Sequence, residues 1–531
     1  MMKKVVCFVV VGALLLSTLI GGCKKAGEES KPHSSTPVAN SGESSENLQD
    51  SSGASTGERM VLKIPTHNPE KMNDQQELKT ILEDRYDVTL EYYDYPDTEA
   101  LSLQIMGGDI PDTIRDQSFA DYHSYCDQGI LAELPIDLIK ENMPLLVEWV
   151  EKNVGEKIWD YVDHNGKNYS VPGLWSLGAK GFVVAYRMDM LRDVGINTVP
   201  TTIDEMDAAL RAVKEAKGFA PFVVNVGSGT ENLSCVLGAY GVYLAYYEQD
   251  GQVVFGGVEP GAKEALETLH TWYADGLLDP EFMTNKGANV KEKMAQNKVL
   301  VTQNRWYMFI PQDAFFDGSM YDVVSQIEGG ELVIADAPKG PRGESGLTQE
   351  NPVTGSGLLF GKHMENEPER LKRYLQVFDD GSFTEEALDL TFWGVEGTTY
   401  TYDEATGMEW IPPYDDVEKR EEFGIGLYQL PGCFNDYDLQ TKYMTKPQYL
   451  QLRLDSEEKG TGLYDTLVPF NRPVFSEKSE TLERIVDDAY IDFITGARSL
   501  DEFDTFVEEW KSAGGTAVLE EGQAIIDATK D

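Results

Sequence analysis

Polar side chains that can both donate and accept hydrogen bonds follow several predicted strands of this sequence. A first strand is predicted over "MVLKIPTH" (60–67), a third ends near "PDTI" (111–114), and "FAPFVV" (219–224) contains another. In open α/β sheets, ligands bind beyond the carboxyl ends of the strands. We therefore expect ligand contacts from the residues at these ends, which are His67, Asn68, Arg115, Asp116, Gln117 and Asn225.

Aromatic residues occur at comparable places. Trp306 and Tyr307 end the predicted strand in "NKVLVTQNRWYM", Trp175 follows a proline turn in "VPGLWS", and Trp393 and Glu396 lie in the glycine-flanked loop "WGVEG". A sugar has an apolar face of C–H groups, which stacks on such rings, and a rim of hydroxyls, which pairs with polar side chains. The alternative is that these tryptophans belong to the hydrophobic core.

The elements that position these residues alternate between strand and helix. After the first strand come a helix in "NDQQELKTILEDRY", a strand in "VTLEYYDY" and a helix in "TEALSLQIM". This alternation predicts an α/β fold. Thr202 and Glu205 form a capping-box pattern before an apolar stripe, and the C-terminal region is strongly helical, with Gly496 as a stop signal.

The N-terminus carries a targeting pattern. Lys3 and Lys4 precede an apolar run that ends at Gly21, Gly22 and Cys23. This run is typical of a signal peptide and short for a membrane span. The segment "LIGGC" resembles the lipobox of bacterial lipoproteins, which implies cleavage before Cys23 and lipid attachment to its sulfur. An ordinary secretory signal is the alternative.

Composition limits the classes of function. Residues 24 to about 58 are rich in Ser, Gly, Glu and Asn, which predicts a flexible tether. The formal net charge of −46 argues against nucleic acid or anionic lipid as partners and favours a neutral ligand. Beyond Cys7 and Cys23, the three remaining cysteines are far apart and odd in number, so buried thiols are favoured over a disulfide framework; they are Cys126, Cys235 and Cys433.

Catalytic and metal-binding motifs are absent from the sequence. There is no G-x-S-x-G and no H-E-x-x-H, and the six histidines are scattered. The segment "GSGLLFGKH" (355–363) imitates a phosphate-binding loop, but its spacing is wrong and His363 stands where Ser or Thr is required. We therefore expect neither an enzyme nor a metal or cofactor, although a calcium ion in an acidic loop such as "DEATG" stays open.

Several motifs together resemble family 1 extracellular solute-binding proteins. They are "IMGGDIPDTI", "NGKNYSVPG", "YRMDMLRDVGINTVPTTIDEM" and "MAQNKVLVTQNRWYM", with "FWGVEGTTYTYDEATG" and "FITGARSLDEFDTFVEEWKSAGG" similar to the lipoprotein branch of that family. One departure is Asn297-Lys298, which replaces the usual Gly-Lys. The resemblance implies a two-lobe periplasmic-binding-protein-like fold of type II, with a hinge between the lobes and the ligand in the cleft. It also implies that Trp306 stacks on a sugar.

The expected organisation follows from the resemblance and the composition. It comprises a signal peptide (1–22), a tether (23–58), a first lobe (59–178), a second lobe (179–352), a return to the first lobe (353–395), and an aromatic loop region with C-terminal helices (396–531), mainly in the second lobe. Residues 400–475 have no clear counterpart in smaller members of the family.

The predicted function is capture of a sugar or oligosaccharide and its delivery to the permease subunits of an ABC importer. The protein is expected to be a monomer on the outer face of the cell membrane, held only by its lipid, in a bacterium of the Gram-positive type. Alternatives are a peptide or other small molecule as ligand, a surface sensor without a transporter, and a glycoside hydrolase with two carboxylates about 5–10 Å apart.

Overall fold

The computed structural model describes residues 59–530 apart from short stretches at 67–68, 97, 116–117, 174–179, 226–229, 312–318, 354, 429, 431–438 and 440–446. The signal peptide, Cys23 and the tether lie outside the described residues. Within the described part of the chain, no helix is long and apolar enough to cross a membrane.

The N-terminal lobe forms around one hydrophobic core that runs from Leu62 to Val171 and resumes from Val353 to Leu430. Its first part contains β1 (Met60–Thr66), α1 (Glu77–Tyr86), β2 (Val88–Asp94), α2 (Thr98–Met106), β3 (Thr113–Arg115), α3 (Phe119–Asp127), α4 (Ile136–Asn142), α5 (Pro144–Asn153), α6 (Ile158–Tyr161), β4 (Asp163–His164), β5 (Lys167–Asn168) and β6 (Ser170–Val171). Its second part contains β13 (Leu358–Phe360), α13 (Pro368–Phe383), α14 (Glu385–Trp393), β14 (Tyr400–Asp403), β15 (Gly407–Trp410) and α15 (Val417–Phe423).

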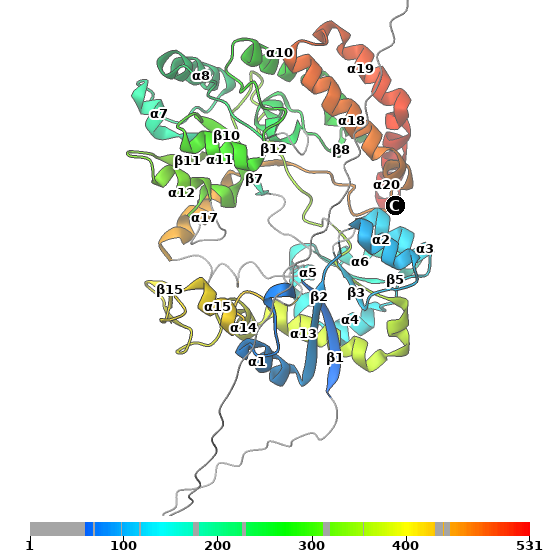
Figure 1. Cartoon of the computed structure of the whole chain (residues 1–531). Coiled ribbons are helices and arrows are strands. Elements are labelled where there is room, and N and C mark those ends of the chain that lie inside the picture. The colour runs from blue at the N-terminus through cyan, green and yellow to red at the C-terminus, as the bar shows by residue number, and fades with distance from the viewer. Residues whose placement is uncertain are drawn as a thin grey trace, which may run out of the picture. The chain divides into compact units, whose positions relative to one another are not determined.

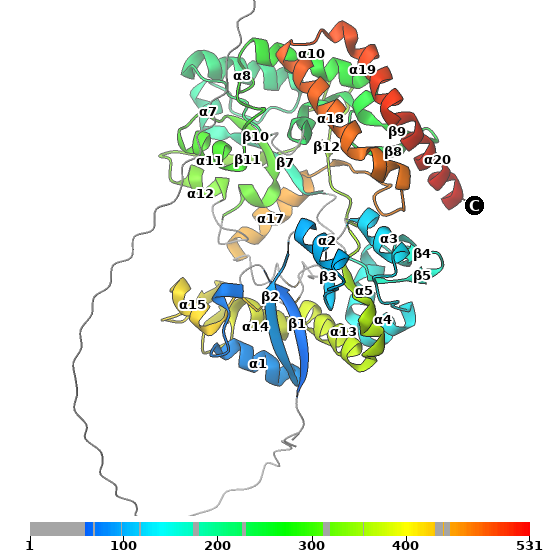
Figure 2. The same cartoon turned by 45° about the vertical axis from the view of Figure 1, so that its right-hand side comes forward.

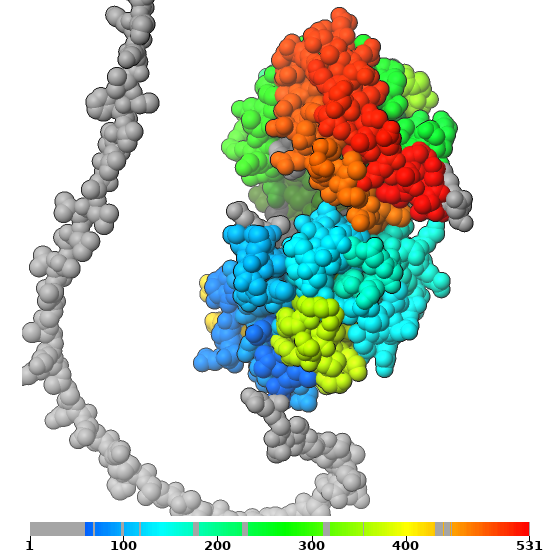
Figure 3. Space-filling view, turned by 90° about the vertical axis from the view of Figure 1, so that its right-hand side faces the viewer, coloured from blue at the N-terminus to red at the C-terminus, as the bar shows by residue number. Residues whose placement is uncertain are grey.

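Two small sheets organise this lobe. Strands β1 and β2 pair in parallel, as a strand–helix–strand unit requires, and alternate residues such as Leu62 and Ile64 enter the core. Strand β13 pairs antiparallel with both β3 and β6. Helix α13 packs against β1, α4 and α5, so segments more than 200 residues apart in sequence lie side by side (Figures 2 and 3).

The C-terminal lobe has a large core and a smaller one beside it. Its first part contains β7 (Phe182–Arg187), α7 (Met188–Asp193), α8 (Ile203–Lys217), α9 (Ser234–Leu237), β8 (Tyr246–Gln249), β9 (Gln252–Phe255), α10 (Pro260–Ala274), α11 (Gly287–Ala295), β10 (Val301–Arg305), a 3₁₀ helix η6 (Trp306–Phe309), α12 (Met320–Ser325), β11 (Leu332–Ala335) and β12 (Leu347–Thr348). Its second part contains α17 (Pro447–Lys459), β16 (Gly462–Leu463), α18 (Pro473–Thr495), α19 (Phe503–Trp510) and α20 (Thr516–Lys530) (Figure 1).

Strand β7 is the centre of the C-terminal lobe. It pairs antiparallel with β10 on one side and β11 on the other, and all six of its residues are buried. Helix α8 begins at Thr202, whose hydroxyl accepts the Glu205 amide, as the capping box predicts. The Glu205 carboxylate, however, accepts from the Thr201 amide and hydroxyl rather than from Thr202.

The last quarter of the chain is divided between the two cores. Phe423 and Tyr428 belong to the N-terminal core, whereas α18 and α19 contribute residues such as Tyr490 and Trp510 to the large C-terminal core. Helix α18 ends at Gly496, which has a left-handed φ of 80°, as the sequence predicts. The predicted lobe boundaries remain predictions, but Phe423, Ile425 and Leu430 are buried in the core of the first lobe.

Candidate functional site

Three chain crossings join the lobes: one between β6 and β7, one between β12 and β13, and one between α15 and α17. The third falls mostly outside the described residues, so we consider the first two. The strand ends nearest these crossings are fixed by the register. Leu358 pairs with both Arg115 and Val171 in the N-terminal lobe, and Arg305 pairs with Phe182 in the C-terminal lobe. We call these two strand ends the crossing edges of the lobes.

Side chains tie the two crossings together. The side-chain amide of Gln349 bonds the main chain of Phe182 twice: its Oε1 accepts from the Phe182 N–H at 2.8 Å, and its Nε2 donates to the Phe182 carbonyl at 2.9 Å. Arg305 forms an ion pair with Glu350 and lies over the Phe182 ring, with 5.5 Å between the guanidinium carbon and the ring centroid. The first residues of β7 are therefore held by the returning chain, which couples the two crossings at the C-terminal edge.

Close backbone contact at the crossings requires glycine. Gly357 has a φ of +72°, and a side chain there would collide with the Val171 carbonyl and the Gly173 amide. Gly462 of β16 lies against Leu347 of β12 with no room for a Cβ atom. The segment after α17 thus packs directly on the second crossing.

The N-terminal crossing edge is built around Tyr95. Its amide donates to the Thr66 carbonyl at 2.8 Å, which joins the end of β1 to the segment after β2. Its hydroxyl donates to the Arg115 carbonyl at 2.7 Å and lies 3.2 Å from the Arg115 amide. Nearby, burial raises the pKa of the Tyr93 hydroxyl to about 12. The strand ends of this lobe therefore bring the side chains of Tyr93 and Tyr95 close to Arg115.

The C-terminal crossing edge is built around Trp306. The Trp306 side chain is only 1% exposed. The guanidinium carbon of Arg453 lies 5.1 Å from the Trp306 ring centroid, and Tyr307 meets the indole edge-to-face at 5.7 Å. Arg453 comes from α17, is 2% exposed and donates to Glu457 at 2.9 Å. Trp306 is thus a core residue in this conformation, whereas Tyr307 is only partly buried.

The other predicted site residues have varied surroundings. Trp393 is 5% exposed and packs edge-to-face on Tyr400 at 5.5 Å, while Glu396 in the loop after α14 is exposed. Asn225 is partly buried and its carbonyl accepts from Asn232. The predictions for His67, Asn68, Asp116, Gln117 and Trp175 fall outside the described residues, as does that for Cys433.

The structure therefore places Trp306, Tyr307 and Arg115 at crossing edges. Trp393 is the last residue of α14 rather than part of a loop as predicted, and Glu396 lies in the loop that follows it in the N-terminal lobe. Sequence reasoning missed Tyr95, Arg305, Glu350 and Arg453. The aromatic run "EYYDY" at a strand end could have pointed to Tyr95, and Arg305 directly precedes Trp306. No sequence signal links Arg453 to Trp306, because about 150 residues separate them.

The described residues contain no group of three or more His, Cys, Asp or Glu side chains arranged to hold a metal ion. Two cysteines are described as free thiols, and burial raises the pKa of both Cys126 and Cys235 to about 12, so neither is a nucleophile at neutral pH. The crossing edges offer hydrogen-bonding and stacking groups, which is the chemistry of binding.

Two lobes joined by several chain crossings, each lobe with aromatic and polar residues at its strand ends, define the class of two-lobe ligand-binding proteins. Comparison with known proteins makes the assignment specific. Residues 78–331 match the family described as bacterial extracellular solute-binding protein. Over these residues, the chain is similar to this family.

The relatives span nearly the whole chain. Lipoprotein LipO of Bacillus subtilis (strain 168) is 22% identical over 519 residues, which cover 91% of this chain and 95% of LipO. The polygalacturonan/rhamnogalacturonan-binding protein YtcQ of the same organism is 23% identical over 458 residues, which cover 81% of this chain and 84% of YtcQ. YtcQ and the matched family are described as binding proteins.

The fold is also found in solved structures. The ABC-transporter substrate-binding protein FusA of S. pneumoniae, in complex with kestose, superposes with a TM-score of 0.66 at 17% identity. The match covers 89% of this chain and 99% of FusA. This likeness confirms the predicted two-lobe fold.

Proposed function

We propose that this protein is a lipid-anchored extracellular receptor that captures an oligosaccharide between its lobes and delivers it to an ABC importer. The observation that carries the proposal is the composition of the crossing edges. Tyr95 and Arg115 on one lobe, and Arg305 and Tyr307 on the other, supply the aromatic faces and hydrogen-bonding groups that a sugar needs. The carbohydrate ligands named for YtcQ and FusA support the same ligand class.

The location and the partners follow from the same reading. The lipobox-like segment that ends at Cys23 supports membrane attachment through lipid, and the name of the relative LipO agrees with it. A tethered receptor requires a membrane partner, for which the permease subunits of an importer are the proposed candidates. We propose a monomer in a Gram-positive bacterium.

Thermal unfolding across a panel of defined oligosaccharides tests the proposal. A ligand that binds only the folded state stabilises it by RT ln(1 + [L]/Kd), so about 2.7 kcal/mol is expected at 100 times Kd. We expect at least one neutral or uronic-acid oligosaccharide to raise the melting temperature, with no product released on prolonged incubation. If peptides raise the melting temperature and no sugar does, the proposed ligand class is wrong. Release of shorter sugars from the oligosaccharides would establish a hydrolase.

A further inference from the structure

A cavity of about 410 Å³ lies in the C-terminal lobe, away from the crossing edge. Its position follows from the register: the Pro221 carbonyl accepts the amides of Leu300 and Val301, at the start of β10, whereas the crossing edge is at the other end of that strand. Three segments enclose it, namely the chain after α8, the turn after α10, and helix α11 with the turn that follows it. Its volume is in the range of small-molecule sites.

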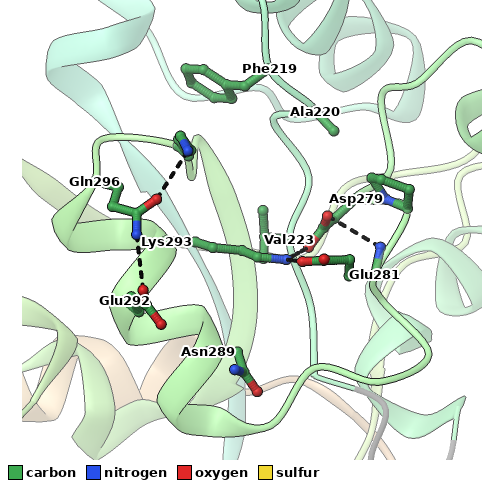
Figure 4. A pocket seen from close by; sticks show the side chains of 11 residues that line it. Phe219, Ala220, Val223, Asp279, Glu281, Asn289, Glu292, Lys293 and Gln296 are labelled. Carbon is green, nitrogen blue, oxygen red and sulfur yellow. Dashed lines mark hydrogen bonds and ion pairs between the residues drawn. The ribbon is translucent and has the colours of Figure 1, made fainter.

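One wall of the cavity is apolar. Phe219 stands at one side with its ring toward the cavity, and Ala220 lies next to it (Figure 4). Val223 and Pro280 complete the apolar part of the lining. Phe219 is only partly buried, so part of its ring is available to a ligand.

The opposite wall is polar and held in place from beneath. Lys293 forms ion pairs with Asp279 and Glu281 and donates to the Asn285 amide oxygen at 3.0 Å. Asn285 is 2% exposed; its amide donates to Asp279 at 2.8 Å and to the Val224 carbonyl at 3.1 Å. A buried, fully hydrogen-bonded network of this kind fixes its members in position.

The side chains of α11 extend this polar wall. The Gln296 amide donates to Glu292 at 3.0 Å and accepts from Lys298 at 3.0 Å, which sets its orientation (Figure 4). Lys293 already uses its donors on its neighbours. The carboxylates of Asp279, Glu281 and Glu292 retain lone pairs that can accept further hydrogen bonds.

The charges of the lining select the kind of ligand. Lys293 already occupies the place between Asp279 and Glu281 that a bound cation would take. Three carboxylates against two lysines disfavour an anion. What remains is a neutral molecule with an apolar face for Phe219 and several hydroxyl donors for the carboxylates, which is the chemistry of a pyranose ring.

We propose that this cavity is a second saccharide-binding site, separate from the site between the lobes, that takes a short segment of a neutral oligosaccharide. The proposal rests on the proposed function, because a receptor for long sugar chains gains effective concentration from a second contact. The ring of a sugar stacks on Phe219, and its hydroxyls donate to Glu281 and Glu292. The site requires no closure of the lobes.

Methyl NMR on the full-length mature protein tests the site directly. The alanine methyls are labelled with ¹³C in a deuterated background, and the Ala220 signal is assigned from an Ala220→Gly variant. Cellobiose, lactose and maltose are the probes, each titrated to millimolar concentration. We expect at least one of them to shift the Ala220 methyl saturably, while the signal of fully buried Ala265 in the same lobe stays in place.

Variants of the lining residues distinguish a specific binding site from weak, nonspecific contact with the surface. Phe219→Ala removes the ring on which the sugar stacks, and it is expected to lower the affinity for the disaccharide by about fivefold or more. Because Phe219 also packs against the large core, Glu281→Gln provides a second test at a carboxylate that is 67% exposed. Glu328→Gln, at an exposed position outside the cavity lining, is the matched control and should leave the titration unchanged.

The outcomes distinguish this site from the site between the lobes. If no disaccharide shifts Ala220, or if the shift survives both Phe219→Ala and Glu281→Gln, the second site does not exist. An oligosaccharide that still raises the melting temperature of Phe219→Ala would show that the proposed function stands without it. If no oligosaccharide raises the melting temperature of the wild-type protein, the proposed function itself is refuted.

Discussion

The two lobes hold the aromatic residues of their crossing edges in different ways. In the N-terminal lobe, Tyr95 is anchored through its hydroxyl to the Arg115 main chain, and its ring stays partly exposed. In the C-terminal lobe, Trp306 is covered by Arg453 and is 1% exposed. An aromatic residue at a strand end can therefore stack on a ligand or belong to the core. Which of the two it does depends on whether residues from distant parts of the chain cover its ring.

The largest expected effect comes from Trp306→Ala. Removal of a fully buried tryptophan leaves a cavity, so we expect the free energy of unfolding to fall by about 3–5 kcal/mol. Chemical denaturation measures the loss. A loss below about 1 kcal/mol, together with a large loss of sugar affinity, would show that Trp306 is a platform rather than core. Trp393→Ala, at a similarly buried tryptophan of the other lobe, is the matched comparison.

A pH effect is expected from a pair of histidines in the N-terminal lobe. His123 and His164 share a hydrogen bond between their Nδ1 atoms at 2.9 Å, and His164 Nε2 bonds Asp127 at 2.9 Å. Burial, and then the neighbouring His164, lower the pKa of His123 from 6.5 to about 4, against weaker opposing effects of Asp127 and Asp163. The folded state thus binds fewer protons than the unfolded state, and stability is lost as the pH falls from about 6.5 to about 4.

The expected loss over this pH range is about 2–3 kcal/mol, measured by denaturant unfolding at a series of pH values. His123→Leu should flatten the pH dependence in this range, because it removes the group that stays neutral when folded. His270→Gln in the C-terminal lobe is the control. An unchanged pH profile in His123→Leu would contradict the assignment.

Removal of the cover over Trp306 is expected to have a smaller effect. Arg453→Met keeps a long apolar side chain but leaves Glu457, which is 17% exposed, without its ion-pair partner. We expect a loss of about 1–3 kcal/mol in unfolding free energy and a red shift of tryptophan fluorescence as Trp306 becomes hydrated. Arg453→Lys should restore part of the stability. If the emission is unchanged in Arg453→Met, the guanidinium does not cover the indole.

The smallest expected effect is that of Tyr95→Phe. The change removes the hydrogen bond to the Arg115 carbonyl and keeps the ring, so we expect a loss of about 0.5–1.5 kcal/mol in stability. Sugar affinity should also fall, because the Tyr95 hydroxyl holds the main chain of Arg115, which contacts the ligand in this account. Calorimetric titration with a binding oligosaccharide gives the second value, and unchanged affinity would place the ligand away from this edge.

The α/β class and most elements were predicted from the sequence because they depend on local patterns, whereas the two-lobe arrangement was implied by the family resemblance. The apolar stripe of α8, the Thr202 cap and the Gly496 stop are signals within a few residues of each other. Asn297 replaces a glycine of the family pattern and keeps its role: it has a left-handed φ of 61°, and its side chain accepts from buried Arg187. Asparagine is among the few residues that adopt this conformation at low cost.

The contacts that bury or expose the predicted site residues could not be predicted from the sequence. Whether Trp306 is exposed depends on Arg453, and whether the crossings are coupled depends on Gln349 meeting Phe182. These contacts join segments more than 140 residues apart, and no periodicity encodes them. The roles of the candidate ligand residues therefore stay predictions, as do the lobe boundaries.

The central claim is that an oligosaccharide contacts both crossing edges at once. Isothermal titration calorimetry with an oligosaccharide that raises the melting temperature tests it most directly, with Arg115→Ala for one lobe and Tyr307→Ala for the other. The account predicts that each variant folds and binds at least about tenfold more weakly, a change of about 1.4 kcal/mol. Wild-type affinity in either folded variant would contradict it.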